Sequence, residues 1–152
     1  NFSETFADPV KFGQLAMPGD NTQEPFVDAD DIADVVFASL TNDRHIGQLY
    51  ELTGPRLLTL AQATKELGNA IGRKVEYLPV TAQTYAVELI THGMPEVVAH
   101  PISELIAEVL DGRNAYLTDG VQRALGRAPK DFADYARETA ATGVWNSERA
   151  AS

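Results

Sequence analysis

The sequence contains no cysteine, which excludes disulfide bonds and cysteine-based metal sites or nucleophiles. It also contains no apolar run that approaches the ~20 residues of a membrane-spanning helix. The first ten residues, NFSETFADPV, lack the basic start and the apolar run of a signal peptide. These absences together predict a cytoplasmic protein that makes no contact with a membrane.

Basic residues are few and scattered along the chain. The sequence has 12 Lys and Arg against 22 Asp and Glu, which gives a formal net charge of −10. No cluster of Lys or Arg exceeds two residues, whereas nucleic-acid binding needs basic patches that neutralise phosphates. We therefore expect no nucleic-acid partner, and we interpret the acidity as a well-solvated surface.

The short motifs of phosphate binding and hydrolysis are also missing. Neither GxGxxG nor GxxxxGK[ST] occurs between a predicted strand and a predicted helix. The phosphate cradle of a dinucleotide site is therefore not expected in these 152 residues. HExxH and GxSxG are absent as well, so neither a zinc protease nor a serine hydrolase is indicated.

The stretch from Pro25 to Pro55 carries the clearest structural pattern. Asp28 is a good helix N-cap, and Asp31 can also accept amide hydrogens of the first turn. The predicted apolar face of this helix is formed by Ile32, Val35, Val36 and Leu40. Residues 48–53 alternate polar and apolar side chains and are predicted to form a strand. A capped helix that returns directly to a strand is an α/β unit.

The same acidic residues do not predict a metal site. A calcium-binding EF-hand loop that began at Asp28 would need glycine at its sixth position and glutamate at its twelfth. Those positions hold Ala33 and Ser39. We therefore assign the acidic residues to helix capping, and we expect no metal.

The remaining elements follow from caps, turns and apolar spacing. Residues 11–18 and 75–80 are predicted strands, the second at an edge because Pro79 lacks an amide hydrogen. Thr59 and Gln62 form a capping box that starts a helix ending at Gly72. The other predicted helices cover residues 81–92, 102–110, 121–125 and about 130–142, with Pro101 separating the second from the preceding segment. Their predicted inward-facing side chains include Tyr85, Leu89, Ile90, Leu105, Ile106, Val109, Leu110, Phe132, Tyr135, Ala136 and Ala140.

These patterns also carry a family resemblance. VDADDIADVVFASLT, followed by H-x-G-Q-x-Y-E-L-T-G-P, resembles the second half of the NmrA-like, atypical short-chain dehydrogenase/reductase proteins. That family includes NAD(P)H-dependent quinone and azo-dye reductases. The resemblance extends from Asn1 to Trp145, and it implies an α/β fold: the C-terminal part of a Rossmann-like domain plus a helix-rich substrate lobe. The Tyr-x-x-x-Lys pair of standard short-chain dehydrogenases is absent from this sequence.

The resemblance also implies a division of the chain and a set of site residues. Residues 1–56 would end the Rossmann-like sheet, 57–145 would form the substrate lobe, and 146–152 would be a frayed tail. Asn1 and Phe2 match the family's Asn-Phe beside the nicotinamide, so they are predicted to contact NAD or NADP. Phe6, Met94 and Tyr116 are predicted from their loop positions to line the substrate pocket; ordinary packing is the alternative for the last two.

Three functional hypotheses are compatible with the sequence. The first is the substrate-side half of an NAD(P)-dependent oxidoreductase that transfers hydride to a quinone-like, dye-like or other small organic acceptor. In that case the chain alone is inactive and needs a missing N-terminal Rossmann half, or it pairs as a homodimer. The second is a non-catalytic, NAD(P)-sensing regulator that binds other proteins. The third is a self-sufficient small α/β binding module.

Overall fold

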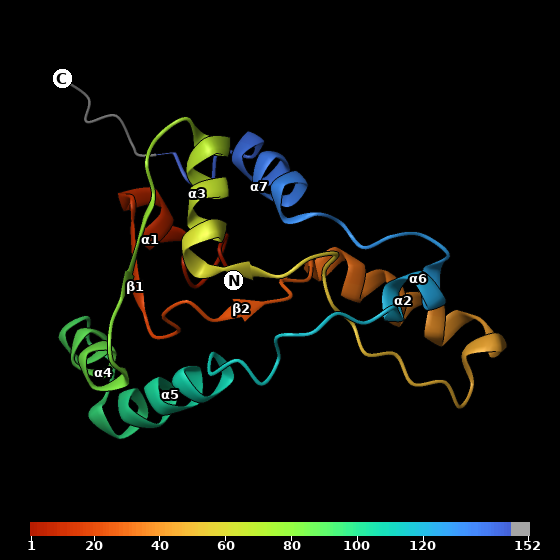
Figure 1. The fold of residues 1–152 in the computed structure, drawn as a ribbon, viewed down its shortest axis with the longest axis horizontal. Helices are drawn as coiled ribbons and strands as arrows, with labels where there is room; N and C mark the ends of the chain where they lie inside the picture. The colour runs from red at the N-terminus through yellow and green to blue at the C-terminus, as the bar shows by residue number, and fades with distance from the viewer. Residues whose placement is uncertain (147–152) are drawn as a thin grey trace.

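The computed structural model describes residues 1–146. Its elements follow one another as shown in Figure 1. They are α1 (Ala7–Phe12), β1 (Gln14–Met17), β2 (Gln23–Glu24), α2 (Ala29–Thr41), the 3-10 helix η1 (Asp43–His45), β3 (Leu58–Thr59), α3 (Leu60–Ile71), β4 (Glu76–Pro79), α4 (Ala82–Thr91), α5 (Glu96–Val109), α6 (Gly120–Leu125) and α7 (Phe132–Ala141). None of these helices has the length and apolarity that crossing a membrane requires.

The described residues form two short strand pairs rather than one larger sheet. β1 and β4 are parallel, with Gln14 opposite Glu76 and Met17 opposite Pro79. β2 and β3 are antiparallel, with Glu24 opposite Leu58. Each pair joins a strand from before residue 56 to one from after it. Because both strand pairs join residues from the two sides of residue 56, the division of the chain at that residue stays a prediction.

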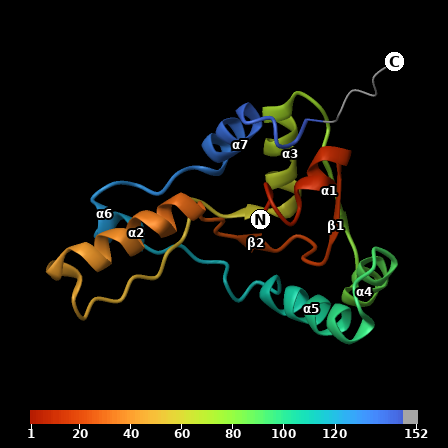
Figure 2. The same cartoon turned by 180° about the vertical axis from the view of Figure 1, so that it is seen from behind.

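The core lies where α1, α3 and α7 pack around β1. Figures 1 and 2 show α3 and α7 side by side above the strands, with α4 and α5 below. Val10, Leu15 and Leu67 are almost completely buried there, and so is Trp145, which is 1% exposed. The predicted inward face of α7 is confirmed, and Trp145, which follows that helix, belongs to the same core.

The start and the end of α3 match the predicted capping signals. Thr59 Oγ1 accepts the Gln62 amide at 3.2 Å, and Gln62 Oε1 accepts the Thr59 amide at 2.9 Å. Gly72 ends the helix in the left-handed region, with φ +70°. A Cβ on Gly68 would lie 2.7 Å from the Arg73 carbonyl oxygen, so glycine lets the chain turn back closely towards β4.

Most of the apolar face predicted for α2 is exposed to solvent rather than buried. Asp28 caps the helix as expected, and the helix packs on α6 and η1. Val35 is buried at 4% exposure, whereas Ile32 is 40%, Val36 50% and Leu40 82% exposed. The periodicity correctly identified an apolar stripe, but nothing in residues 1–146 covers most of it.

The strand predicted at residues 48–53 does not form. A strand requires a ladder of backbone hydrogen bonds to a neighbour. Within residues 1–146, the amides of residues 49–53 donate no hydrogen bond to any acceptor. The alternating pattern is present in the sequence, but no strand pairs with it within residues 1–146.

Three further differences concern the helices. Pro101 does not begin a separate helix but lies within α5, where it removes a single amide donor in the second turn. Leu105 and Val109 of α5 are 58% and 44% exposed rather than buried, because Ala99 and Ser103 form the buried face. Residues 7–12 form the helix α1, which the turn-rich sequence around Pro9 did not indicate. The predicted frayed tail lies outside the described residues, apart from the exposed Asn146.

Candidate functional site

The predicted cofactor-side residue Phe2 belongs to a chain of aromatic rings. Its ring lies 6.0 Å from that of Phe6, 5.7 Å from Phe26 and 5.4 Å, edge to face, from Phe132. The chain of rings continues through Tyr135 to Trp145. Such tilted and edge-to-face contacts are favourable geometries for aromatic pairs. Phe2 is only 6% exposed, so its ring packs within the core rather than lining an open pocket.

Hydrogen bonds fasten the first six residues to the C-terminal part of the chain. The Trp145 indole Nε1 donates to the Phe2 carbonyl oxygen at 2.8 Å, and the Tyr135 hydroxyl donates to Ser3 Oγ at 3.2 Å. The Asn1 carbonyl oxygen accepts the Phe6 amide at 2.9 Å. Asn1 itself is exposed. A fixed backbone thus presents the Asn1 side chain to the outside.

The predicted pocket residues do not form one cluster. Phe6 is half-buried beside Phe2, whereas Met94 is half-buried in the turn between α4 and α5. Tyr116 is 47% exposed, and its hydroxyl donates to the Glu51 carboxylate. That carboxylate raises the pKa of Tyr116 by accepting its proton in a hydrogen bond. Glu51 also helps line an open hollow of about 520 Å³, which includes Leu49 and lies among residues 117–123.

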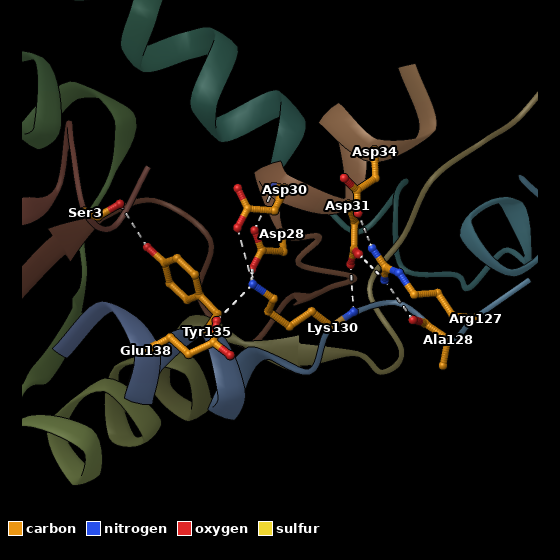
Figure 3. Close-up of polar contacts among 10 residues, drawn as sticks. All are labelled: Ser3, Asp28, Asp30, Asp31, Asp34, Arg127, Ala128, Lys130, Tyr135 and Glu138. Carbon is orange, nitrogen blue, oxygen red and sulfur yellow. Dashed lines mark hydrogen bonds and ion pairs between the residues drawn. The ribbon is translucent and has the colours of Figure 1, made fainter. Parts of the chain in front are cut away.

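A network of ion pairs joins α2 to the segment before α7 (Figure 3). Asp31 is completely buried; its Oδ1 lies 2.5 Å from Arg127 Nη1, and its Oδ2 accepts the Lys130 amide at 2.7 Å. Arg127 also binds Asp34 at 2.7 Å. Lys130 Nζ lies 3.1 Å from Asp28 Oδ2. Asp31 was expected to help cap α2, but the structure gives it this long-range role.

This network is structural rather than catalytic. Each carboxylate that it buries is matched by a cation or an amide, and the Glu138 and Asp28 carboxylates raise the pKa of Lys130. The network was missed in the sequence because Asp31 and Lys130 are 99 positions apart. Among residues 1–146, no group of three or more His, Cys, Asp or Glu side chains could hold a metal ion.

Glu24 in β2 is a carboxyl group that sequence analysis did not single out. It is 8% exposed, and its Oε1 has no hydrogen-bond partner within residues 1–146. Burial raises the pKa of Glu24, and the nearby Asp111 carboxylate raises it further. The sequence did not indicate that this side chain would be buried, because β2 is only two residues long.

Within residues 1–146, the starts of the longer helices do not fit the phosphates of a dinucleotide. Such phosphates bind to free amides at a helix start. Side chains of Asp28, Thr59, Thr81 and Asp131 already occupy the first turns of α2, α3, α4 and α7. The longest helix, α5, begins with an acidic residue, Glu96, which would repel an anion.

Known oxidoreductases are similar in sequence to this chain. No family model matches the chain. It is 34% identical over 129 residues to an NAD(P)H azoreductase of Xenophilus azovorans, covering 85% of this chain and 45% of that protein. It is 32% identical over 122 residues to an uncharacterized oxidoreductase, YesF, of Bacillus subtilis, covering 79% and 43%. The chain is thus similar to the C-terminal half of NmrA-like, atypical short-chain dehydrogenase/reductase proteins. It spans about half the length of the curated relatives it matches and corresponds to their C-terminal half.

Solved structures show the same fold at lower sequence identity. The NADPH complex of the Escherichia coli quinone oxidoreductase QOR2 has a TM-score of 0.77 at 19% identity, covering 90% of this chain and 50% of that one. A Citrobacter triphenylmethane reductase, complexed with NADP(H), has a TM-score of 0.75 at 18% identity, covering 87% and 46%. The expected fold class is thus confirmed: the chain has the α/β architecture of the C-terminal part of a Rossmann-type reductase, including its helix-rich lobe.

Proposed function

We propose that this chain is the substrate-side half of an NAD(P)H-dependent reductase. Its acceptor would be a quinone-like, dye-like or other small organic molecule. The observation that carries the proposal is the 34% identity to an NAD(P)H azoreductase across 85% of this chain. The solved structures with the same fold include a quinone oxidoreductase and a triphenylmethane reductase, whose names indicate acceptors of the same class.

The chemistry is hydride transfer from the nicotinamide, for which the protein supplies position and a dry pocket. Because side chains already cap the starts of α2, α3, α4 and α7, and α5 begins with Glu96, the pyrophosphate would be held by an N-terminal Rossmann half. Residues 1–56 would complete the sheet of that half, and residues 57–145 would cover the acceptor. The chain alone would then neither bind NAD(P)H usefully nor turn over.

The proposal gives the predicted site residues distinct roles. Asn1 is exposed on a fixed backbone and would contact the nicotinamide side of the cofactor, while Phe2 holds that backbone in place. Phe6, Met94 and Tyr116 would contact the acceptor. Tyr116 is the most accessible of these three and has a hydroxyl that could orient a carbonyl or azo group.

The test uses the full-length reductase that contains this chain, with NADPH and either a quinone or an azo dye. We expect NADPH oxidation by the full-length protein and none by residues 1–152. Asn1→Ala should lower kcat/KM for NADPH roughly fivefold, since it removes one hydrogen bond worth about 1 kcal/mol. Glu4→Gln, at an exposed neighbour in the same segment, is the matched control and should have no effect.

The acceptor side needs a separate measurement. Tyr116→Phe and Met94→Ala should raise the KM for the acceptor and leave the KM for NADPH unchanged. A full-length protein that binds NADPH but reduces neither quinone nor dye would contradict the enzymatic proposal. Calorimetry that detects a micromolar, one-to-one complex of NADPH with the isolated chain would contradict the proposal that an N-terminal half holds the cofactor.

A further inference from the structure

Residues 1–6 form a closed turn, which we call the 1–6 turn. The Asn1 carbonyl oxygen accepts two amides, that of Glu4 at 3.2 Å and that of Phe6 at 2.9 Å. Because one oxygen binds both amides, the two ends of the turn are tied together and keep a fixed spacing. The proposed function gives these two ends different contacts, Asn1 with the cofactor and Phe6 with the acceptor. The placement of the turn therefore bears on both reactants at once.

Two side chains from the C-terminal part of the chain hold the 1–6 turn by hydrogen bonds. Trp145 Nε1 donates to the Phe2 carbonyl oxygen at 2.8 Å, across 143 positions of sequence. The Tyr135 hydroxyl donates to Ser3 Oγ at 3.2 Å, across 132 positions (Figure 3). Both donors belong to α7 or to the segment that follows it. The turn is thus fastened to one region of the fold that is remote in sequence.

The bond from Trp145 is the more important of the two. It is buried, with Trp145 1% and Phe2 6% exposed, so water does not compete for the Phe2 carbonyl oxygen. An indole N–H can only donate, which fixes the direction of the bond. A buried carbonyl that loses its donor carries a desolvation penalty, so the turn is held to the position in which this bond is made. The bond from Tyr135 is only partly buried and is the weaker constraint.

Trp145 is itself fixed by several neighbours. The chain turns after α7 at Gly143, whose φ is +80°, and the Asn146 amide donates to the Gly143 carbonyl oxygen at 2.9 Å. Arg73 Nη2 donates to the Trp145 carbonyl oxygen at 3.1 Å. The Tyr135 ring lies edge to face with the indole at 6.3 Å. The indole is therefore a rigid reference point against which the 1–6 turn is placed.

We propose that Trp145, with Tyr135 as a weaker second donor, is a positioning residue of the reductase site. Through the Phe2 carbonyl oxygen, Trp145 sets the place of Asn1 and Phe6 relative to the rest of the fold. This inference rests on the proposed function for the contacts of those two residues. Hydride transfer needs the reacting atoms about 3–3.5 Å apart and aligned. A displaced turn should therefore lower kcat more than it weakens the binding of NADPH.

Aromatic packing alone is the other explanation for a fixed turn. The Phe2 ring lies 5.7 Å from that of Phe26 and 5.4 Å from that of Phe132. Apolar burial is non-directional, whereas a hydrogen bond constrains both distance and angle. The rings thus keep the turn in the core, and the bond from Trp145 decides how the turn is oriented there. Trp145→Phe separates the two explanations, because it leaves an aromatic ring and removes the indole N–H.

Steady-state kinetics of the full-length reductase that contains this chain, with NADPH and a quinone, test the proposal. We expect Trp145→Phe to lower kcat about tenfold and to change the Kd for NADPH less than about twofold. The control is Thr59→Ala, which destabilises the fold by removing the N-cap of α3 and touches neither donor. It should leave kcat unchanged at a temperature where both variants are folded. Equal kcat values for the two variants would overturn the proposal.

A milder variant keeps the test decisive if Trp145→Phe does not fold. Tyr135→Phe removes only the hydroxyl that binds Ser3, and it should lower kcat by about threefold, again with little change in the Kd for NADPH. Adding Ser3→Ala should lower kcat no further, because both changes remove the same bond. Tyr135→Phe with the kcat of the parent protein would overturn the proposal.

Hydrogen exchange of the same full-length proteins separates this inference from the proposed function. In peptides that cover residues 1–6, exchange should be faster in Trp145→Phe than in the parent, and bound NADPH should slow it more in the parent. Equal exchange in the two proteins would overturn the inference. The expected exchange differences without any NADPH oxidation by the parent would support the positioning role and contradict the reductase. Oxidation with an unchanged kcat in Trp145→Phe would support the reductase and overturn the inference.

Discussion

Replacing Asp31 with alanine removes the centre of the network that ties α2 to the segment before α7. The carboxylate is completely buried, and it binds the Arg127 guanidinium and the Lys130 amide with different oxygens. The guanidinium keeps a second partner in Asp34, so it loses only part of its pairing. The Lys130 amide loses its side-chain acceptor altogether.

The expected cost combines two contributions. A charge-assisted hydrogen bond contributes about 1.5–3 kcal/mol, and the lower value applies because the Arg127 side chain is 45% exposed. An amide left without an acceptor costs about 1–3 kcal/mol, for which we take a value near 1.5. Asp31→Ala should therefore lower the free energy of unfolding by about 3 kcal/mol. For a chain of this length, the melting temperature should fall by roughly 6–12 °C.

Urea denaturation followed by the fluorescence of the buried Trp145 measures this change. The matched control is Asp34→Ala, which removes the exposed partner of the same Arg127 and should cost at most about 0.5 kcal/mol. If Asp31→Ala and Asp34→Ala destabilise equally, or if Asp31→Ala costs less than about 1 kcal/mol, the buried carboxylate does not hold the two segments together and the reasoning is wrong.

Three further predictions concern single side chains. Thr59→Ala should cost about 1 kcal/mol in the same denaturation because it removes the N-cap of α3, and Thr59→Ser should restore most of the loss. Because burial raises the pKa of Glu24 in the folded chain, stability from this group is present at low pH and is lost as the pH rises through that pKa. Glu24→Gln should thus raise the melting temperature at neutral pH but not in acid, and a gain independent of pH would contradict this cause. Trp145→Phe removes the bond to the Phe2 carbonyl oxygen, so limited proteolysis should cut within the first six residues faster than in the parent chain.

Much of the local structure could be predicted because its causes lie within a few residues. The Thr59–Gln62 capping box, the Asp28 cap and the left-handed Gly72 each depend on near neighbours, and all three occur as expected. For β1 and β4, the existence of the two strands was predicted, but their parallel pairing was not. The family resemblance rested on the motif of residues 27–41 and 45–55, and the 34% identical relative is an NAD(P)H azoreductase, as the resemblance predicted.

The candidate site was less predictable, because its parts meet across long sequence distances. Asn1 and Phe2 were chosen by resemblance, and only the folded chain shows that Trp145 fixes the carbonyl of Phe2. Met94 and Tyr116 were predicted from their loop positions. In the structure, Met94 lies in the turn between α4 and α5, whereas Tyr116 follows α5 and contacts Glu51. Their contact with an acceptor stays a prediction.

The sequence by itself determined where α2, α3 and α7 lie, where α2 and α3 are capped, and which family the chain resembles, because those properties depend on local spacing and on motifs. Only the tertiary structure decided which apolar faces are covered. The stripe on α2 and the alternation at residues 48–53 are real patterns, but burial and strand pairing require partners. Within residues 1–146, Val35 finds its partners, whereas Phe37, Leu40 and the backbone of Tyr50 and Leu52 do not.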